Sequence, residues 1–204
     1  RTKTGVVGMN YFKSINSSTL LNIQASAGTL KDGDYLDTLD NNFTPHNYFG
    51  MDFGNSTIAL NAHLSKKFNA KNNLKTGVYG TLIKLDMLDS VYRYDYKQYV
   101  KLTDIQGQSM LVRPYAEWQY KPTLRWKINA GIHAQYFTEN NKTSLEPRLG
   151  FNFALDESNS LNAAYGLHSQ TPAVYLFFRR VTLNDGSVYN PNSNLGFTKS
   201  HHFV

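Results

Sequence analysis

The stretch MLVRPYAEWQY, from Met110 to Tyr120, alternates apolar and polar residues with a period of two. After the polar turn Lys121–Thr123 the alternation restarts in LRWKINAGIHAQY, from Leu124 to Tyr136. A period of two over this length indicates β-strands with one face in apolar surroundings and the other in polar surroundings. The charged and histidine side chains all fall on the polar faces: Arg113, Glu117, Arg125, Lys127 and His133.

The same alternation extends outward in both directions and predicts further strands. Their expected ranges are Lys3–Lys13, Thr19–Leu30, Asn55–Phe68, Leu74–Leu85, Leu145–Leu155 and Leu161–Leu167, and another strand begins before Val204. Most of these strands are about 10–13 residues long, whereas strands of globular proteins are usually about 5–6. A tilted strand needs about 9–11 residues to cross a bilayer.

Tight and long connections alternate between the expected strands. The tight turns are Ser14–Ser18, Asn69–Asn73, Lys121–Thr123 and Asp156–Ser160; the longer connections are Lys31–Gly54, Asp86–Gly107, Thr138–Thr143 and Thr171–Thr198. The alternating tyrosines of Asp86–Gly107 also allow its strands to continue as a hairpin. In outer-membrane barrels the short turns face the periplasm and the long loops face outside. We therefore predict an all-β fold, an antiparallel transmembrane β-barrel segment of about eight full strands plus the start of a ninth.

The composition agrees with a barrel and excludes several classes of site. Mean hydropathy is −0.46 and no run of about 18 apolar residues occurs, so no transmembrane helix is expected. The chain has no cysteine, which excludes zinc-thiolate sites, disulfides and thiol catalysis. The net charge of +6 comes from scattered residues rather than a basic face, so we expect no nucleic-acid partner.

Four segments resemble the barrel of TonB-dependent outer-membrane receptors, in the branch found in Bacteroidetes-type bacteria. They are SLEPRLG (Ser144–Gly150), YGLHSQ (Tyr165–Gln170), and the segments Asn190–Leu195 and Thr198–Val204. The resemblance implies a plug domain, a segment that contacts TonB, and more strands than residues 1–204 contain. We therefore expect this chain to be one segment of a larger barrel.

The same resemblance implies active uptake of a scarce nutrient, such as a metal chelate, a glycan or a peptide. The partners that it implies are outer-membrane lipid and lipopolysaccharide, TonB and a small nutrient ligand, and it leaves room for a surface lipoprotein. Two other functions stay open. One is a passive outer-membrane channel or small closed barrel; the other is a soluble all-β binding or adhesion domain, in which the apolar face of Trp126–Tyr136 would meet a second sheet.

The expected strands and connections assign positions to the candidate functional residues. On the polar face, expected to face the barrel lumen, lie Arg113, Glu117, Arg125, Lys127, His133, Glu146 and Arg148, which can pair across strands. The long connections carry candidate ligand-binding residues: Tyr92, Tyr94, Tyr96, Tyr99, Tyr175, Phe177, Phe178, Arg179 and Arg180. These rings and guanidinium groups can stack and bind anions. Equally, they can pack on one another or on lipopolysaccharide, with the Phe177–Arg180 run forming a buried turn over the barrel mouth.

Neither a catalytic nor a metal site is expected. No Gly-x-Ser-x-Gly, His-Glu-x-x-His or phosphate-binding glycine loop occurs, and no pair of carboxylates has a defined separation. His168 and the pair His201-His202 raise the question of a metal, but adjacent residues of a strand point to opposite faces. We therefore predict no enzyme activity, no cofactor and no metal ligand set.

Overall fold

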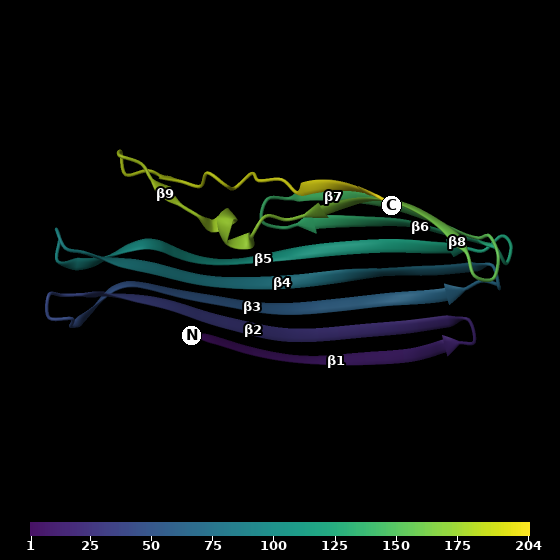
Figure 1. Cartoon of the computed structure of the whole chain (residues 1–204), viewed down its shortest axis with the longest axis horizontal. Coiled ribbons are helices and arrows are strands. Elements are labelled where there is room, and N and C mark those ends of the chain that lie inside the picture. Colours follow the sequence, from purple (N-terminus) through teal and green to yellow (C-terminus); the bar gives the residue numbers. More distant parts are fainter.

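The protein, described by a computed structural model over residues 1–204, is one large antiparallel sheet (Figure 1). Its strands are β1 Thr2–Asn16, β2 Thr19–Leu39, β3 Pro45–Lys67, β4 Asn72–Arg93, β5 Gln98–Tyr120, β6 Trp126–Phe137, β7 Lys142–Ala154, β8 Ser160–Gln170 and β11 Thr198–Phe203. Each strand pairs with the next along the chain, and β11 follows β8. The predicted all-β fold with a ninth strand is confirmed. No helix has the length and apolarity that crossing a membrane requires.

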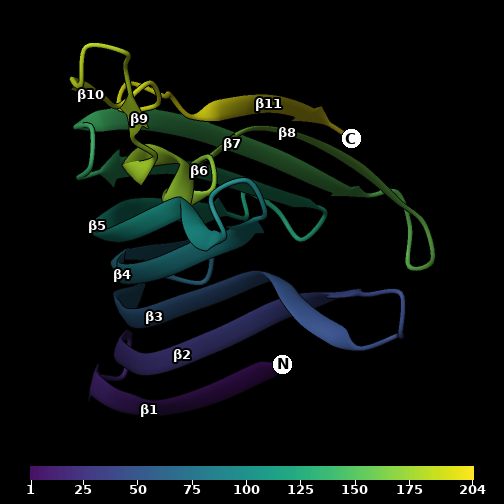
Figure 2. The ribbon, with the colours of Figure 1, turned by 90° about the vertical axis from the view of Figure 1, so that its left-hand side faces the viewer.

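The sheet is curved and open. Strands β1 and β11 are its two edges, and no ladder joins them (Figure 2). The eight predicted strands therefore do not close a small barrel within these residues.

One face of the sheet is an apolar band of limited height. In β5 the band runs from Met110 to Tyr120 on alternate residues, which is the length that a tilted strand needs to cross a bilayer. Its side chains are widely exposed: Ile58 is 58% exposed and Leu145 is 56% exposed. No second sheet covers this face, although the soluble alternative required one against Trp126–Tyr136.

The apolar band ends at a defined row of cross-strand partners. Ala27, Ile58, Leu82 and Met110 lie side by side in β2 to β5. Two residues further along each strand, the same face carries Thr29, Ser56, Lys84 and Gln108. Strands β2 to β5 therefore continue well past the apolar band. There the face that carried the band is mainly polar, whereas the opposite face carries Phe53, Met87 and the buried Leu85 and Ile105.

The prediction of a long loop over Lys31–Gly54 was wrong. Strand β2 continues to Leu39 and strand β3 begins at Pro45, so only a short turn separates them. The glycines of this range had indicated a loop, but Gly50 lies opposite Tyr35 in the ladder. A Cβ at Gly33 or Gly50 would approach the Tyr35 ring to 3.1 or 3.3 Å, so both glycines make room for that ring. The alternative of a hairpin over Asp86–Gly107 is correct, since β4 ends at Arg93 and β5 begins at Gln98.

The connection between β8 and β11 folds back over the polar face of the sheet (Figures 1 and 2). It contains the short 3-10 helix η1, Val174–Phe178, and the two-residue strands β9, Val181–Thr182, and β10, Val188–Tyr189. Phe177 of η1 is 1% exposed and forms the main buried cluster with Leu111 and Phe137. Only 12 of the 204 residues are buried, so the fold has no ordinary globular core.

Candidate functional site

Six of the seven predicted polar-face residues lie together on one face of β5, β6 and β7. Glu117 aligns with Gly131 and then with Arg148 across three strands, and His133 aligns with Glu146. Arg113 and Lys127 occupy the same face by their spacing from Glu117 and His133. Arg125 does not join them, because β6 begins only at Trp126 and Arg125 lies in the turn before it. That this face lines a lumen stays a prediction.

Glu146 is the centre of a buried polar network. Glu146 is 3% exposed. Its carboxylate accepts hydrogen bonds from the Gln135 side chain, the Ser169 backbone N–H (3.1 Å) and Arg148 Nη2 (3.0 Å). Ser144 and Ser169 share a hydroxyl–hydroxyl hydrogen bond of 2.5 Å beside it. A buried carboxylate is tolerated only with such compensation, so these donors hold the network in one arrangement.

This network explains two of the motifs on which the family resemblance rests. The regular β7–β8 ladder reaches only as far as the pair Arg148 and Gly166. Beyond that pair, the Ser144–Gly150 motif holds the Tyr165–Gln170 motif through Glu146 and the two serines. The motif residues thus join two strands where backbone pairing stops. Sequence reasoning missed Gln135, Ser144 and Ser169, whose uncharged side chains gave no signal.

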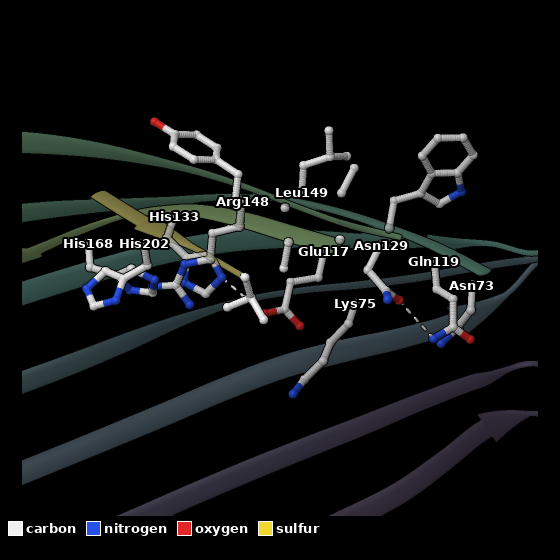
Figure 3. Close-up of a pocket in the computed structure, with 18 residues that line it drawn as sticks. Asn73, Lys75, Glu117, Gln119, Asn129, His133, Arg148, Leu149, His168 and His202 are labelled. Atoms are coloured by element: carbon white, nitrogen blue, oxygen red, sulfur yellow. Dashed lines mark hydrogen bonds and ion pairs between the residues drawn. The ribbon is translucent and has the colours of Figure 1, made fainter. Parts of the chain in front are cut away.

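A hollow of about 510 Å³ lies on the polar face beside this network (Figure 3). The imidazoles of His133, His168 and His202 gather at one end of it with the Arg148 guanidinium. Glu117 occupies the middle, and its carboxylate oxygen Oε1 accepts a hydrogen bond from His133 Nε2 at 3.0 Å. The alternating pattern predicted His133 and Arg148 on the polar face but did not indicate that His168 and His202 meet them.

The second candidate site is a hollow of about 650 Å³ between the projecting hairpins β2–β3 and β4–β5. Three predicted binding residues, Tyr92, Tyr94 and Tyr99, line it and contact one another edge to face, with ring centroids 5.1–5.3 Å apart. Tyr96 does not line it and instead lies under the Arg93 guanidinium at 5.6 Å.

The β2–β3 hairpin supplies the other wall of this hollow, with residues that sequence reasoning missed because it placed them in a loop. The hydroxyls of Thr38 and Tyr94 lie 2.8 Å apart, and Tyr99 donates to the Asn47 carbonyl at 2.8 Å. Tyr48 stacks on Tyr94 at 6.4 Å. These bonds hold the two hairpin tips together, so the tyrosines form a preformed aromatic hollow.

Asp40 and His46 place a charge at the rim of the aromatic hollow. The backbone N–H of Thr44, then the His46 side chain and the backbone N–H of Asn42, lower the pKa of Asp40 below its usual range. His46 Nε2 lies 3.2 Å from the Asp40 carboxylate. Asp40 therefore stays ionised at neutral pH and caps its own turn.

The predicted binding residues of the β8–β11 connection divide by burial. Phe177 is buried in the core cluster, and the Phe178 ring fills the space beside Gly107, where a Cβ would approach it to 2.5 Å. Tyr175 is 40% exposed. Arg179 and Arg180 are both exposed, and neither makes a side-chain hydrogen bond or an ion pair. Phe177 and Phe178 thus anchor the connection to the wall. That residues of this connection bind a ligand stays a prediction.

Comparison with known proteins supports the fold and leaves the family open. No family model matches the chain, and no curated protein sequence matches it. Among solved structures, the copper transporter OprC is similar with a TM-score of 0.68 at 14% sequence identity. The similarity covers 87% of this chain and 31% of that one, so this chain spans about a third of the length of OprC. The fold is therefore similar to that of a segment of the OprC structure.

Proposed function

We propose that this chain forms part of the wall of an outer-membrane transport barrel and carries a nutrient-capture site in the aromatic hollow at its hairpin tips. The observation that carries the proposal is the exposed apolar band, one bilayer in height, on one face of a sheet whose other face is polar. A bilayer satisfies such a band, because each strand pairs its backbone within the sheet and turns its apolar side chains to lipid.

Aromatic residues at the short-turn end of the sheet support the same arrangement. Trp118 stacks on Tyr120 at 5.3 Å, and Trp126 packs on Phe153 at 4.5 Å. Aromatic girdles of this kind lie at the membrane interface of outer-membrane barrels. The proposal places the turns at this end in the periplasm and the projecting hairpins outside the cell.

The capture site follows from the preformed aromatic hollow. Its volume suits a small ligand, and stacked tyrosines bind planar or sugar rings with little loss of side-chain entropy. By the family resemblance, the ligand is a metal chelate, a glycan or a peptide, and TonB energises its uptake through segments outside residues 1–204. A surface lipoprotein partner belongs to the same proposal, and we assign no catalytic step to the chain. A passive channel is the second candidate, favoured by the polar face alone.

Single cysteines test the topology, because the chain has none of its own. Phe43→Cys lies at the tip of the β2–β3 hairpin and Ser158→Cys lies in the turn between β7 and β8. We expect a membrane-impermeant maleimide to label Phe43→Cys on intact cells and Ser158→Cys only after lysis, with the unaltered protein as control. Equal labelling of both on intact cells would exclude the proposed orientation.

Uptake by cells that express the protein tests the capture site. Ferric citrate, maltohexaose and trialanine represent the three ligand classes, and a protonophore separates active from passive uptake. For the probe that is taken up, we expect Tyr94→Ala to lower the initial rate about fivefold to tenfold through the lost stacking. Tyr96→Ala, at the same tip but outside the hollow, should leave the rate unchanged.

Two outcomes would contradict this expectation. Uptake that resists the protonophore would favour the passive channel, and an equal loss of uptake in both variants would show that the hollow does not bind the transported ligand.

A further inference from the structure

A second binding site lies on the polar face, some distance down the wall from the aromatic hollow. It is the hollow lined by His168, His202, Arg148 and Lys75, shown in Figure 3. From the hydrogen-bonding groups that remain free there, we propose that it binds a small molecule through a carboxylate or phosphate group. The proposal does not depend on the transport function.

The floor of the hollow is one row of cross-strand partners. Lys75, Glu117, Gly131, Arg148, Gly166 and His202 follow one another across β4, β5, β6, β7, β8 and β11. The two glycines interrupt the row and leave space between the longer side chains. The His168 ring uses this space, since a Cβ at Gly166 would approach its Nε2 to 2.7 Å. The row therefore forms a depression instead of a closed ladder of ion pairs.

The acidic groups in and beside this hollow are already engaged. Glu117 is held by His133 Nε2 at 3.0 Å, and Glu146 accepts three hydrogen bonds, one of them from Arg148. The carboxylate of Glu146 is buried and does not line the hollow. These contacts engage one oxygen of Glu117 and both oxygens of Glu146, and no group of three ligating side chains is placed to hold a metal ion.

The donors, in contrast, remain free. Arg148 Nε is buried and has no hydrogen-bond partner, although Nη2 binds Glu146. The rings of His168 and His202 contact each other edge to face at 4.8 Å, and neither forms a hydrogen bond. Lys75 makes no ion pair and lies over the Tyr115 ring at 5.7 Å. The Arg148 side chain is 37% exposed, so an anionic oxygen in the hollow can bind its accessible N–H groups beside the two imidazoles.

The geometry also selects the kind of anion. The His168 and His202 rings lie 4.8 Å apart, and Figure 3 shows Arg148 beside them, so one ligand group can approach all three side chains. A guanidinium group recognises the planar or tetrahedral oxygens of carboxylate and phosphate. The volume of about 510 Å³ is that of a small-molecule site.

The two adjacent histidines of β11 provide a matched test. His202 faces the hollow, whereas His201 points to the opposite face, where its Nδ1 lies 3.0 Å from the Tyr165 hydroxyl. Citrate and inorganic phosphate would be titrated calorimetrically into the natural protein purified in detergent, with glucose as the neutral probe. We expect citrate and phosphate to bind and glucose not to bind. His202→Leu should weaken anion binding about fivefold, and His201→Leu should leave it unchanged.

Arg148→Gln provides the larger effect, an expected loss of about tenfold or more in anion affinity. Because this change also disturbs Glu146, the heat-modifiable migration of the folded barrel on gels would be checked for every variant. His202 lies exposed on the edge strand and keeps the test independent of that network. If the unaltered protein bound neither citrate nor phosphate, the proposal would be overturned. This holds also where the reason is that an acidic side chain of the protein already fills the site. Equal weakening by His201→Leu and His202→Leu would overturn it as well.

Discussion

Replacing Ile132 by arginine is expected to destabilise the inserted protein by about 2–4 kcal/mol, because the new charge would face lipid at mid-height of the apolar band. Ile132 aligns with Ala116 in β5, close to the middle of the Met110–Tyr120 stretch, and its side chain is exposed on the apolar face. The measurement is equilibrium unfolding by urea in lipid vesicles, compared with the unaltered protein.

The control for this experiment lies three residues earlier on the same strand. Asn129 points to the polar face, and its side chain makes only one hydrogen bond, which it accepts from the exposed Gln119 side chain at 3.1 Å. Asn129→Arg should therefore change the free energy of unfolding by less than about 0.5 kcal/mol. If Ile132→Arg were tolerated as well as Asn129→Arg, the apolar face would not meet lipid, and the outer-membrane proposal would fail with it.

Truncation of Glu146 is expected to have the other large effect. Glu146→Ala removes the acceptor of three hydrogen bonds and leaves Gln135, the Ser169 N–H and Arg148 without their partner. We expect the free energy of unfolding to fall by about 3 kcal/mol, since Gln135 and the Ser169 N–H lose a charged acceptor in a buried site, while Arg148 is 37% exposed and can be solvated. Glu146→Gln keeps the shape and one acceptor, so it should lose less than Glu146→Ala in the same urea experiment.

Glu117 supplies the matched control for this second prediction. It is also a glutamate of the polar face with a basic partner, His133, but its side chain is 46% exposed. An exposed pair contributes at most about 1 kcal/mol, so Glu117→Ala should cost far less than Glu146→Ala. Similar losses for both would mean that burial of Glu146 does not determine its contribution, contrary to the network described above.

The strands could be predicted from the sequence because a sheet with one apolar and one polar face alternates the two residue types with a period of two. From Met110 to Tyr136 that period placed the charged residues on one face, and the register agrees for Arg113, Glu117, Lys127 and His133. The exception, Arg125, lies in a turn whose length the pattern does not encode. Leu124 beside it looked like the first apolar residue of a strand and is instead fully exposed.

The projecting hairpins were harder to predict, because above the apolar band the face that would meet lipid turns polar and apolar residues such as Leu85 and Ile105 remain on the opposite face. Asp, Asn and Gly then dominate, as they do in loops, and only backbone pairing shows that Lys31–Gly54 is strand. The pairing of Tyr35 with Gly50 depends on a partner some 15 residues away, which no local pattern contains. The same holds for His168 and His202, which meet only because β11 pairs with β8.

The strands of the sheet differ in length, and this difference separates a regular part of its long-loop end from an irregular part. Strands β2 to β5 rise as continuous ladders, so parting them requires many backbone hydrogen bonds to break together. Beside them, above β6 to β8, the rim consists of irregular chain whose buried anchor is Phe177. Segments with few buried contacts open at the lowest free energy. We therefore expect fluctuations at this end of the sheet to be larger in the chain between Thr171 and Phe197 than in the hairpins that carry the aromatic hollow.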